Sequence, residues 1–306
     1  MSVRSSVIIA ALALFLGGCI TANLSPEPEI FSHQVEPEVV AASMNPKILR
    51  MLTINLAHGR GTGLHQALQG KEKAKANLDA VDALIRKENA DVVALQEADS
   101  PSAWSGGFDH VDYLARAAKY GWGVHTAHAE GAGLAYGTAI ISRLPMNGHD
   151  AHTFEPARAS LPKGFSIATI DWPGAGMVID VVSVHLEPLR SAIRQRQAAE
   201  VITFLRDRNR PLVIMGDLNT EWDHEDGVLQ NLVEELELTV FVPEHEDAVT
   251  YPRLGRRLDW ILISRELEFV KLKILVDEVS DHRAVVAELR KAVQPSGHIT
   301  RGGDRS

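Results

Sequence analysis

The sequence is poorest in cysteine, because Cys19 is the only one among its 306 residues. One cysteine cannot close a disulfide within the chain, so the domain must be stabilised by its hydrophobic core even in an oxidising compartment. Positive charge is also in short supply, with 31 Lys and Arg against 40 Asp and Glu and a net charge of −9. This balance disfavours broad electrostatic capture of nucleic acid, which usually needs a basic face. The length and the 45% hydrophobic content fit one large domain or two small ones.

The chain also lacks a hydrophobic run long enough to span a bilayer comfortably, since its longest apolar stretch covers residues 7–16. Arg4 precedes this stretch and small residues follow it, so residues 1–18 are predicted to be a secretory signal. The residues that follow, Leu16-Gly17-Gly18-Cys19, resemble a bacterial lipobox. Lipidation of Cys19 would leave no thiol for catalysis and would hold the protein on a membrane surface of the cell envelope. The alternative is a plain secretory signal in which the position of Cys19 is accidental.

Four segments are expected along the chain. Residues 19–46 carry several Pro and Glu residues with little periodicity and are predicted to be an extended, lipidated tether. Residues 47–291 form the folded domain, and the polar, Gly-rich residues 292–306 are a flexible tail. Within the domain, strands are predicted at 47–55, 91–97, 136–143, 165–172, 176–185, 211–217, 257–264, 267–275 and 284–290, and helices at about 74–88, 190–207 and 227–236. Strands on both sides of helices, with hairpins among them, predict an α/β fold with mixed sheets.

Polar groups stand at the ends of several of these predicted strands. They are Asn55, Glu97, His185, Asp217 with Asn219, Asp259, and Asp281 with His282. Taken singly, each has an ordinary explanation, such as a turn residue, a helix cap or, for Asp259, an ion pair with Arg256 or Arg257. Strand ends in α/β folds lie at one edge of the sheets, so together these groups can converge. Carboxylate and amide oxygens without thiolates suit Mg²⁺ or Mn²⁺, and this set is typical of metal-assisted phosphoester hydrolysis.

The motifs LTIN, VVALQE, GTAIISR, SVHL, VIMGDLN, RLDWIL and SDHRAVVAEL occur in this order between residues 47 and 290. In this order they resemble the endonuclease/exonuclease/phosphatase superfamily, which includes DNase I-like nucleases, inositol polyphosphate phosphatases and neutral sphingomyelinases. The resemblance implies a four-layered α/β sandwich, with two mixed sheets face to face and helices outside. GDLN followed by SDH is the specific part of the match, because either motif alone is weak.

The resemblance also implies roles for the residues at the strand ends. Glu97 would be the main ligand of Mg²⁺ or Mn²⁺, with Asn55 beside it and Asp281 nearby. Asp217 would orient the attacking water, and Asn219 would hold water or a phosphate oxygen. His185 and His282 would contact the phosphate, with Asp259 supporting His282.

Other polar groups have two open interpretations each. Arg158 matches an arginine that often precedes a strand in the family and faces the phosphate, or it is a surface arginine. His58 follows Ala57 where many members carry a histidine or acid one position earlier, and is a possible contributor to the metal shell. His125 and His128 suggest a second metal or a solvated loop or strand. Two further groups are also open: Arg190, Arg194 and Arg196 contact phosphates or form a solvated helix face, and residues 104–108 form an aromatic loop beside the metal or merely pack on the domain.

Three functions are compatible with this sequence. The first is a metal-dependent phosphodiesterase of the cell envelope that acts on lipid head-group or inositol-type diesters and is held at the membrane by Cys19. The second is an extracytoplasmic nuclease, against which the charge of −10 after loss of residues 1–18 counts modestly. The third is a non-catalytic binding lipoprotein, which the retention of the whole polar set disfavours. A monomer is expected in each case.

Overall fold

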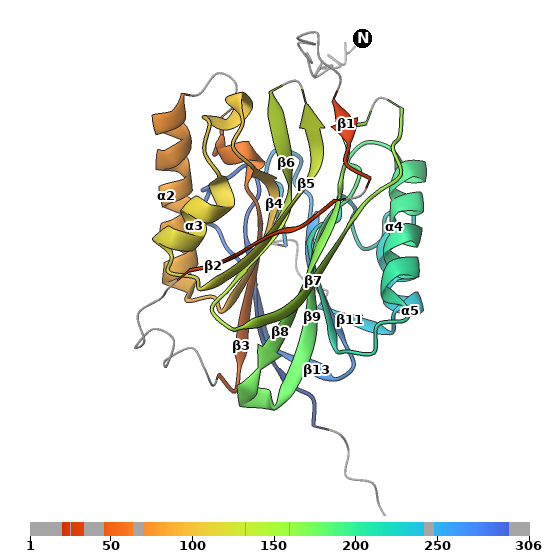
Figure 1. The fold of residues 1–306 in the computed structure, drawn as a ribbon. Helices are drawn as coiled ribbons and strands as arrows, with labels where there is room; N and C mark the ends of the chain where they lie inside the picture. The colour runs from red at the N-terminus through yellow and green to blue at the C-terminus, as the bar shows by residue number, and fades with distance from the viewer. Residues whose placement is uncertain are drawn as a thin grey trace, which may run out of the picture.

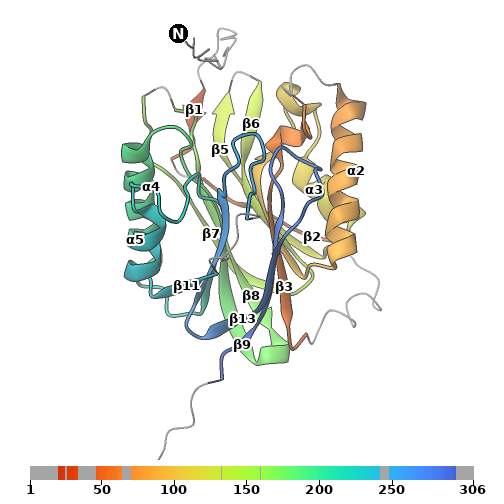
Figure 2. The same cartoon turned by 180° about the vertical axis from the view of Figure 1, so that it is seen from behind.

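The computed structural model describes residues 20–24, 26–33, 46–63, 70–131, 133–158, 160–241 and 248–293. The predicted signal at 1–18, Cys19 and most of the predicted tail lie outside these residues. Two mixed β-sheets lie face to face between two pairs of helices (Figures 1 and 2), as expected for a four-layered sandwich. Among the described residues, no helix is long and apolar enough to cross a membrane.

The first sheet has eight strands in the order β1-β5-β6-β4-β3-β14-β13, with β2 also paired to β5. Its strands are β1 (Thr21–Ala22), β2 (Glu29–Ser32), β3 (Leu49–Asn55), β4 (Val92–Asp99), β5 (Trp122–Gly131), β6 (Leu134–Ser142), β13 (Leu267–Ile274) and β14 (Val285–Lys291). Only β3 and β4 run parallel to each other among its seven-strand path. The sheet is therefore mixed, as the alternation of hairpins and helices in the sequence predicts.

The second sheet has six strands in the order β11-β12-β10-β9-β8-β7. They are β7 (Met146–Thr153), β8 (Gly164–Trp172), β9 (Met177–His185), β10 (Leu212–Asp217), β11 (Leu238–Val240) and β12 (Asp259–Ser264). β9 and β10 are parallel, and α4 connects them as a crossover helix. This connection brings His185 and Asp217 to neighbouring positions at the ends of their strands.

The helices lie outside the sheets. α2 (Lys71–Glu88) and α3 (His110–Ala117) cover the first sheet, and α4 (Ser191–Leu205) and α5 (Val228–Glu235) cover the second (Figure 1). Short 3₁₀ turns are η1 (Ala57–Gly59), η3 (Ala103–Ser105) and η4 (Pro173–Ala175). One apolar layer separates the sheets, and one lies under each helix pair. Burial of these three layers supplies the main stabilisation in a chain without disulfides.

The segment predicted as a free tether is, in its described part, attached to the first sheet. β1 pairs with Glu130 and Ala129 of β5, and β2 pairs with the other end of the same strand. Phe31 lies over Gly123, where any side chain would collide with the phenyl ring. The structured domain thus begins before residue 47. The added strands cover part of the outer edge of β5, which would otherwise present unpaired backbone groups.

β5, β7 and β11 were not predicted as strands. β7 carries Asn147, His149, Asp150 and His152 and lies at the edge of its sheet, so its sequence lacks an apolar run. β5 contains His125 and His128, which are both buried. The prediction of a solvated position for these histidines is wrong, since they bond inward to the Ala98 carbonyl and to two threonine hydroxyls.

Candidate active site

The polar groups predicted at strand ends meet at one edge of the sandwich, the upper edge in Figure 1. Asn55 ends β3, His185 ends β9 and Asp217 ends β10. Asp259 starts β12 directly opposite Asp217, and the turn with Asp281 and His282 leads into β14 beside β3. Both sheets contribute, so the groups converge across the interface between them. We call this region the catalytic edge.

Asp217 lies at the centre of the cluster and is buried. Its Oδ2 accepts a hydrogen bond from Asn55 Nδ2 at 3.0 Å, and its Oδ1 accepts one from the backbone N–H of Asn219 at 3.0 Å. The same Oδ2 lies 3.6 Å from His185 Nε2 and 3.7 Å from His282 Nε2. Burial raises the pKa of Asp217 to about 7, His282 opposes this shift and Asp259 adds to it. A carboxyl with a pKa near neutrality is suited to proton transfer.

Gly216 sets the position of Asp217. Its φ is +148°, and a Cβ built on it would lie 2.0 Å from the carbonyl oxygen of Val184 on β9. Only glycine lets β9 and β10 approach this closely while the chain takes this backbone conformation. The glycine of the GDLN motif is therefore required by packing, next to the carboxylate.

His282 is held by Asp259, with Nδ1 lying 2.8 Å from Asp259 Oδ2. Burial lowers the pKa of His282, but the neighbouring carboxylates of Asp259 and Asp217 outweigh it and raise the pKa to about 10. The imidazole is thus a cation at neutral pH and directs Nε2 toward Asp217. The ring of Tyr251 packs against it at a centroid distance of 4.8 Å. The alternative pairing of Asp259 with Arg256 or Arg257 is not what the structure shows.

Glu97 is aimed into the cluster by a β-bulge. The register between β4 and β6 shifts between Gln96 and Ala98, and Glu97 has a φ of +47°. Such bulges redirect a side chain and often lie next to active sites. The carboxylate lies 3.2 Å from His58 Nε2, 3.5 Å from an Arg60 nitrogen and 4.0 Å from His185 Nε2. Burial raises its pKa, but its positively charged neighbours, chiefly His58 and Arg60, dominate and hold the pKa of Glu97 far below its usual value.

Two further residues beside Glu97 belong to the cluster. His58 Nδ1 lies 2.7 Å from Asp99 Oδ1, and although burial lowers the pKa of His58, Asp99 and Glu97 raise it above the usual value. Arg60 lies between two carboxylates, with Nη2 2.5 Å from Asp281 Oδ2. His58 was predicted as a contributor, whereas Arg60 was not predicted. Nothing in its sequence context separates Arg60 from a surface arginine.

Lys163 is a second functional candidate, besides Arg60, that the sequence did not predict. Its Nζ lies 3.0 Å from His185 Nε2 and 3.3 Å from His185 Nδ1. Burial lowers the pKa of Lys163, against the attraction of Glu97, Asp217 and Glu187. Burial and the charge of Lys163 hold the pKa of His185 well below its usual value, so His185 is neutral. Lys163 directly precedes β8, which runs antiparallel to the strand that ends in His185. A basic residue at the start of such a strand is the sequence feature that could have identified it.

Arg158 lies in the loop before β8 and is exposed. Its backbone carbonyl accepts a hydrogen bond from Arg190 Nη1 at 2.5 Å. The structure gives no contact between its side chain and the cluster, so substrate binding by Arg158 stays a prediction. Arg194 is not on a solvated face, because its guanidinium is buried against Asp226 at 2.6 Å. It therefore fixes the loop after β10 to α4.

The two aromatic residues of the loop at 104–108 pack in different places. Trp104 meets the ring of His58 edge-on at 5.7 Å and packs with Tyr136 on the tip of β5 and β6. Phe108 instead packs with Tyr113 on the core under α2 and α3. Trp104 thus borders the catalytic edge, whereas Phe108 has a structural position.

The donor set fits a divalent cation. Asp281 Oδ1 is buried and, within the described part of the chain, has no hydrogen-bond partner. Glu97 and Asp281 also share one cation, Arg60, in the structure. Two carboxylates that attract the same positive charge, one with an unsatisfied oxygen, suit the hard-oxygen preference of Mg²⁺ or Mn²⁺. Asn55 is less free to bind a metal, because its Oδ1 accepts from the N–H of Ala57 while Nδ2 donates to Asp217.

A second group has metal-like spacing, namely Asp217, Asp259 and His282, with ligand atoms within 4.8 Å of one another. The hydrogen bond between His282 and Asp259 accounts for much of this closeness. A cationic imidazole cannot bind a metal through its protonated nitrogens. The Glu97 side of the cluster therefore fits a metal better, and this group fits hydrogen bonding and proton transfer better.

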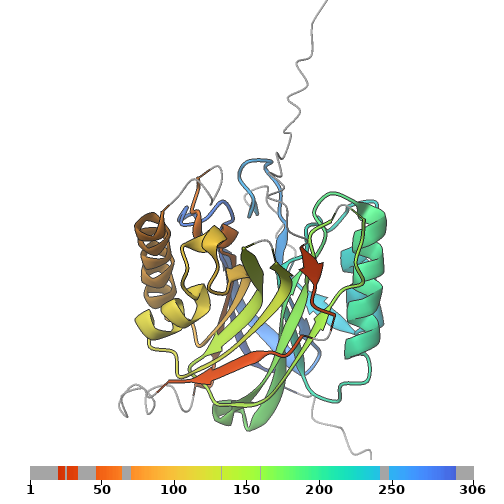
Figure 3. The same ribbon diagram turned by 45° about the horizontal axis from the view of Figure 1, so that its top comes forward.

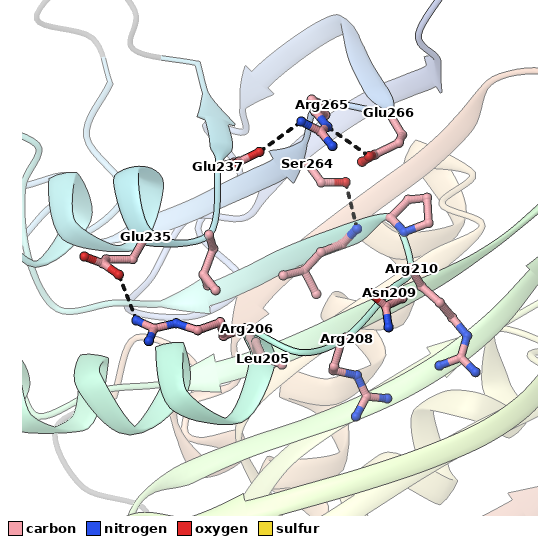
Figure 4. A pocket seen from close by; sticks show the side chains of 13 residues that line it. Leu205, Arg206, Arg208, Asn209, Arg210, Glu235, Glu237, Ser264, Arg265 and Glu266 are labelled. Atoms are coloured by element: carbon pink, nitrogen blue, oxygen red, sulfur yellow. Dashed lines mark hydrogen bonds and ion pairs between the residues drawn. The ribbon is translucent and has the colours of Figure 1, made fainter.

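A separate hollow lies at the opposite edge of the second sheet, around the start of β10 and the end of β12 (Figure 4). Arginines surround it, but Arg206 pairs with Glu235 at 2.8 Å and Arg265 pairs with Glu237 at 3.1 Å. These cations are already neutralised, so this hollow is not an evident site for a phosphate group.

Together the fold and the cluster define a class of protein, the phosphoester hydrolases built on two packed mixed sheets. The chain belongs to the endonuclease/exonuclease/phosphatase family, whose model matches residues 52–282. The match ends on His282, and it includes every residue of the cluster described above.

Solved structures with the same fold include family proteins from Beutenbergia cavernae and Bacteroides vulgatus. The first is 22% identical, with 80% of this chain and 72% of that chain covered and a TM-score of 0.62. The second is 15% identical, with 81% and 100% covered and the same TM-score. Beta toxin of Staphylococcus aureus is 19% identical, with 78% and 99% covered and a TM-score of 0.57. A comparison with curated proteins found no match. At these identities the likeness to solved structures supports the fold.

Proposed function

We propose that the protein is a Mg²⁺- or Mn²⁺-dependent phosphodiesterase of the cell envelope that acts on lipid head-group or inositol-type diesters. The observation that carries the catalytic part is the convergence of Glu97, Asp217 and His282 with His185 and Lys163 on one edge. The cluster combines a strongly acidic carboxylate, a carboxyl with a pKa near 7 and two cations. A structural ion-pair network would not need a carboxyl poised near neutrality.

A divalent metal is the implied cofactor, as is general for this family. Glu97 and Asp281 would hold it, with Asn55 alongside. When bound, it would stabilise the negative charge that develops on phosphate oxygens.

The chain's own side chains supply the remaining functions. Asp217 is positioned to accept a proton from the attacking water, and Asn55 and the N–H of Asn219 hold its carboxylate in place. His282, kept charged by Asp259, and Lys163 place positive charge where a phosphate would lie. His185, which is neutral, can donate a hydrogen bond to the same oxygens from between Glu97 and Asp217.

The preference for a lipid-derived diester rests on the sequence. The predicted leader and the lipobox-like residues before Cys19 favour work at a membrane, and the net charge of −9 disfavours a polyanionic nucleic acid. The fold itself does not choose between these substrates, since one fold serves many of them.

The test is a substrate panel with the chain from residue 20 onward, which keeps β1 and β2. Bis-p-nitrophenyl phosphate, plasmid DNA, RNA, phospholipid vesicles and inositol phosphates are each incubated with Mg²⁺, with Mn²⁺ and with a chelator. We expect chelator-sensitive release of head groups and a loss of at least about a hundredfold in the Glu97→Gln and Asp217→Asn variants. Plasmid nicking without lipid turnover would identify the protein as a nuclease instead. If all substrates stay intact, the catalytic proposal is wrong.

A further inference from the structure

Three leucines project from loops of the catalytic edge into solvent. Leu189 is 86% exposed, Leu254 is 59% exposed and Leu161 is 45% exposed. Isolated exposed leucines are common on proteins, but these three belong to three different loops that surround one site. Together they give the rim of the site an apolar component.

The chain itself places these leucines around the site. Leu161 stands two residues before Lys163, Leu189 four residues after His185, and Leu254 three residues after Tyr251, which packs on His282. A hydrogen bond from Arg190 to the carbonyl of Arg158 joins the first two loops. The leucines therefore border the cluster on both the β8 and β9 side and the β12 side.

Each leucine has arginines beside it in the sequence. Arg158 precedes Leu161, Arg190 follows Leu189, and Arg253 and Arg256 flank Leu254. Arg158, Arg253 and Arg256 are exposed, and Arg190 is partly exposed. Arg190 and Arg256 each lie 3.5 Å from a carboxylate, of Glu187 and Glu221 respectively, so the positive charge available to a bilayer is that of Arg158 and Arg253. Apolar side chains with adjacent cations match a bilayer surface, where the former enter the acyl boundary and the latter meet lipid phosphates.

The N-terminal segment reaches the same edge. β1 runs beside the end of β5 (Figure 3). Ile20, just before β1, packs on the small cluster of Leu134, Tyr136 and Trp104. Trp104 in turn touches His58, which contacts Glu97. Cys19 is bonded to Ile20, so a lipid on Cys19 would be attached one residue from the catalytic edge and not at the end of a long free tether.

We propose that the catalytic edge is a membrane-binding surface whose partner is a bilayer containing anionic phospholipid. Leu161, Leu189 and Leu254 enter the interface, and Arg158 and Arg253 contact the head groups. The active site then faces the membrane. This inference rests on the proposed function for its purpose, namely access to diesters in the same membrane, but the binding is measurable without hydrolysis.

The first experiment measures sedimentation of the chain from residue 20 onward with vesicles of phosphatidylglycerol and phosphatidylethanolamine, and with phosphatidylcholine vesicles as a neutral comparison. We expect binding to the anionic vesicles, about a tenfold weaker partition for Leu189→Ser or Leu254→Ser, and a loss on the order of a hundredfold or more when all three leucines are replaced by serine. Val293→Ser is the matched control, because Val293 is 81% exposed at the opposite edge.

A second measurement reports orientation. The chain from residue 20 onward contains no cysteine, so an environment-sensitive fluorophore can be placed at one position. The emission maximum of a label at Leu189→Cys should shift to shorter wavelength on anionic vesicles, whereas that of a label at Val293→Cys should not. Thermal unfolding of each variant should match the wild type, since the replaced side chains are exposed.

The outcomes separate this inference from the proposed function. Hydrolysis of bis-p-nitrophenyl phosphate should be unchanged in the leucine variants, since these side chains do not contact the cluster. If the wild type hydrolyses this substrate but does not bind vesicles, or binds equally in the triple variant, the membrane surface is refuted and the enzyme is not. If the wild type binds vesicles through the leucines but hydrolyses nothing, the proposed function fails instead. If the wild type binds no vesicles but self-associates, and the triple variant does not self-associate, the leucines form a contact between copies of the chain and the inference is overturned.

Discussion

Nδ1 of His282 lies 2.8 Å from Oδ2 of Asp259, while Nε2 of the same ring faces Asp217 at 3.7 Å. Asp259 thus fixes the ring orientation and keeps the imidazole charged on the side where a phosphate would lie. Asp259 starts β12 of the second sheet, and His282 lies in the turn before β14 of the first, so the pair also ties the two sheets together at the catalytic edge.

Replacement of this carboxylate tests its role. Asp259→Asn keeps the shape but removes the charge, so the pKa of His282 should fall and catalysis should weaken by about a hundredfold or more, chiefly in kcat. Steady-state kinetics with bis-p-nitrophenyl phosphate and NMR titration of the histidine measure both effects. An Asp259→Asn enzyme with wild-type kcat would show that His282 does not act as a cation in the reaction.

Replacing Lys163 or Arg158 tests which of these two cations contacts the substrate. Lys163→Met should lower kcat/KM by about ten- to a hundredfold because a buried cation next to His185 is lost, and Lys163→Arg should retain part of the activity. Arg158→Met should change it little, since this side chain is exposed. The same diester assay ranks the variants. A larger loss from Arg158→Met than from Lys163→Met would support the role that the sequence predicts for Arg158.

Most of the strands were predictable, because apolar runs such as residues 211–217 must be buried and end in polar residues. The site was predictable as far as it lies at strand ends. Glu97 was found in this way, but the bulge that aims it depends on pairing with β6, which no local pattern records. Lys163 was missed because it stands at the start of a strand, and β1 was missed because Pro and Glu residues nearby concealed its pairing with β5.

Gly216 should be among the least replaceable residues of the chain. In Gly216→Ala the new methyl group would collide with the Val184 carbonyl and force β10 away from β9, at a cost of about 3 kcal/mol or more of unfolding free energy. Gly227→Ala is the matched control, since Gly227 also has a positive φ but has open space around it. Its cost should be about 1 kcal/mol. Urea unfolding measures both, and equal losses would show that the close approach of β9 and β10 is not rigid.

His128 predicts how stability responds to acid. Its two ring nitrogens each lie 2.9 Å from a threonine hydroxyl, and burial, with a smaller contribution from His125, lowers its pKa to about 3. The unfolded chain takes up a proton near pH 6.5 whereas the folded chain does not, so unfolding binds protons between these values and stability falls as pH drops. Between pH 7.5 and pH 5.5 this one group should remove about 1.4 kcal/mol of unfolding free energy.

The measurement that isolates this contribution is urea unfolding of the wild type and of His128→Gln at both pH values. The glutamine variant is expected to be less stable at pH 7.5, because a fitted buried ring is lost, but its stability should decline less on acidification by about the same 1.4 kcal/mol. His149, which is exposed on β7, provides the comparison, and His149→Gln is measured at the same two pH values. If the wild type and His128→Gln lose equal stability on acidification, His128 is not held neutral in the folded protein. The two threonine hydroxyls would then accept hydrogen bonds from a charged imidazole.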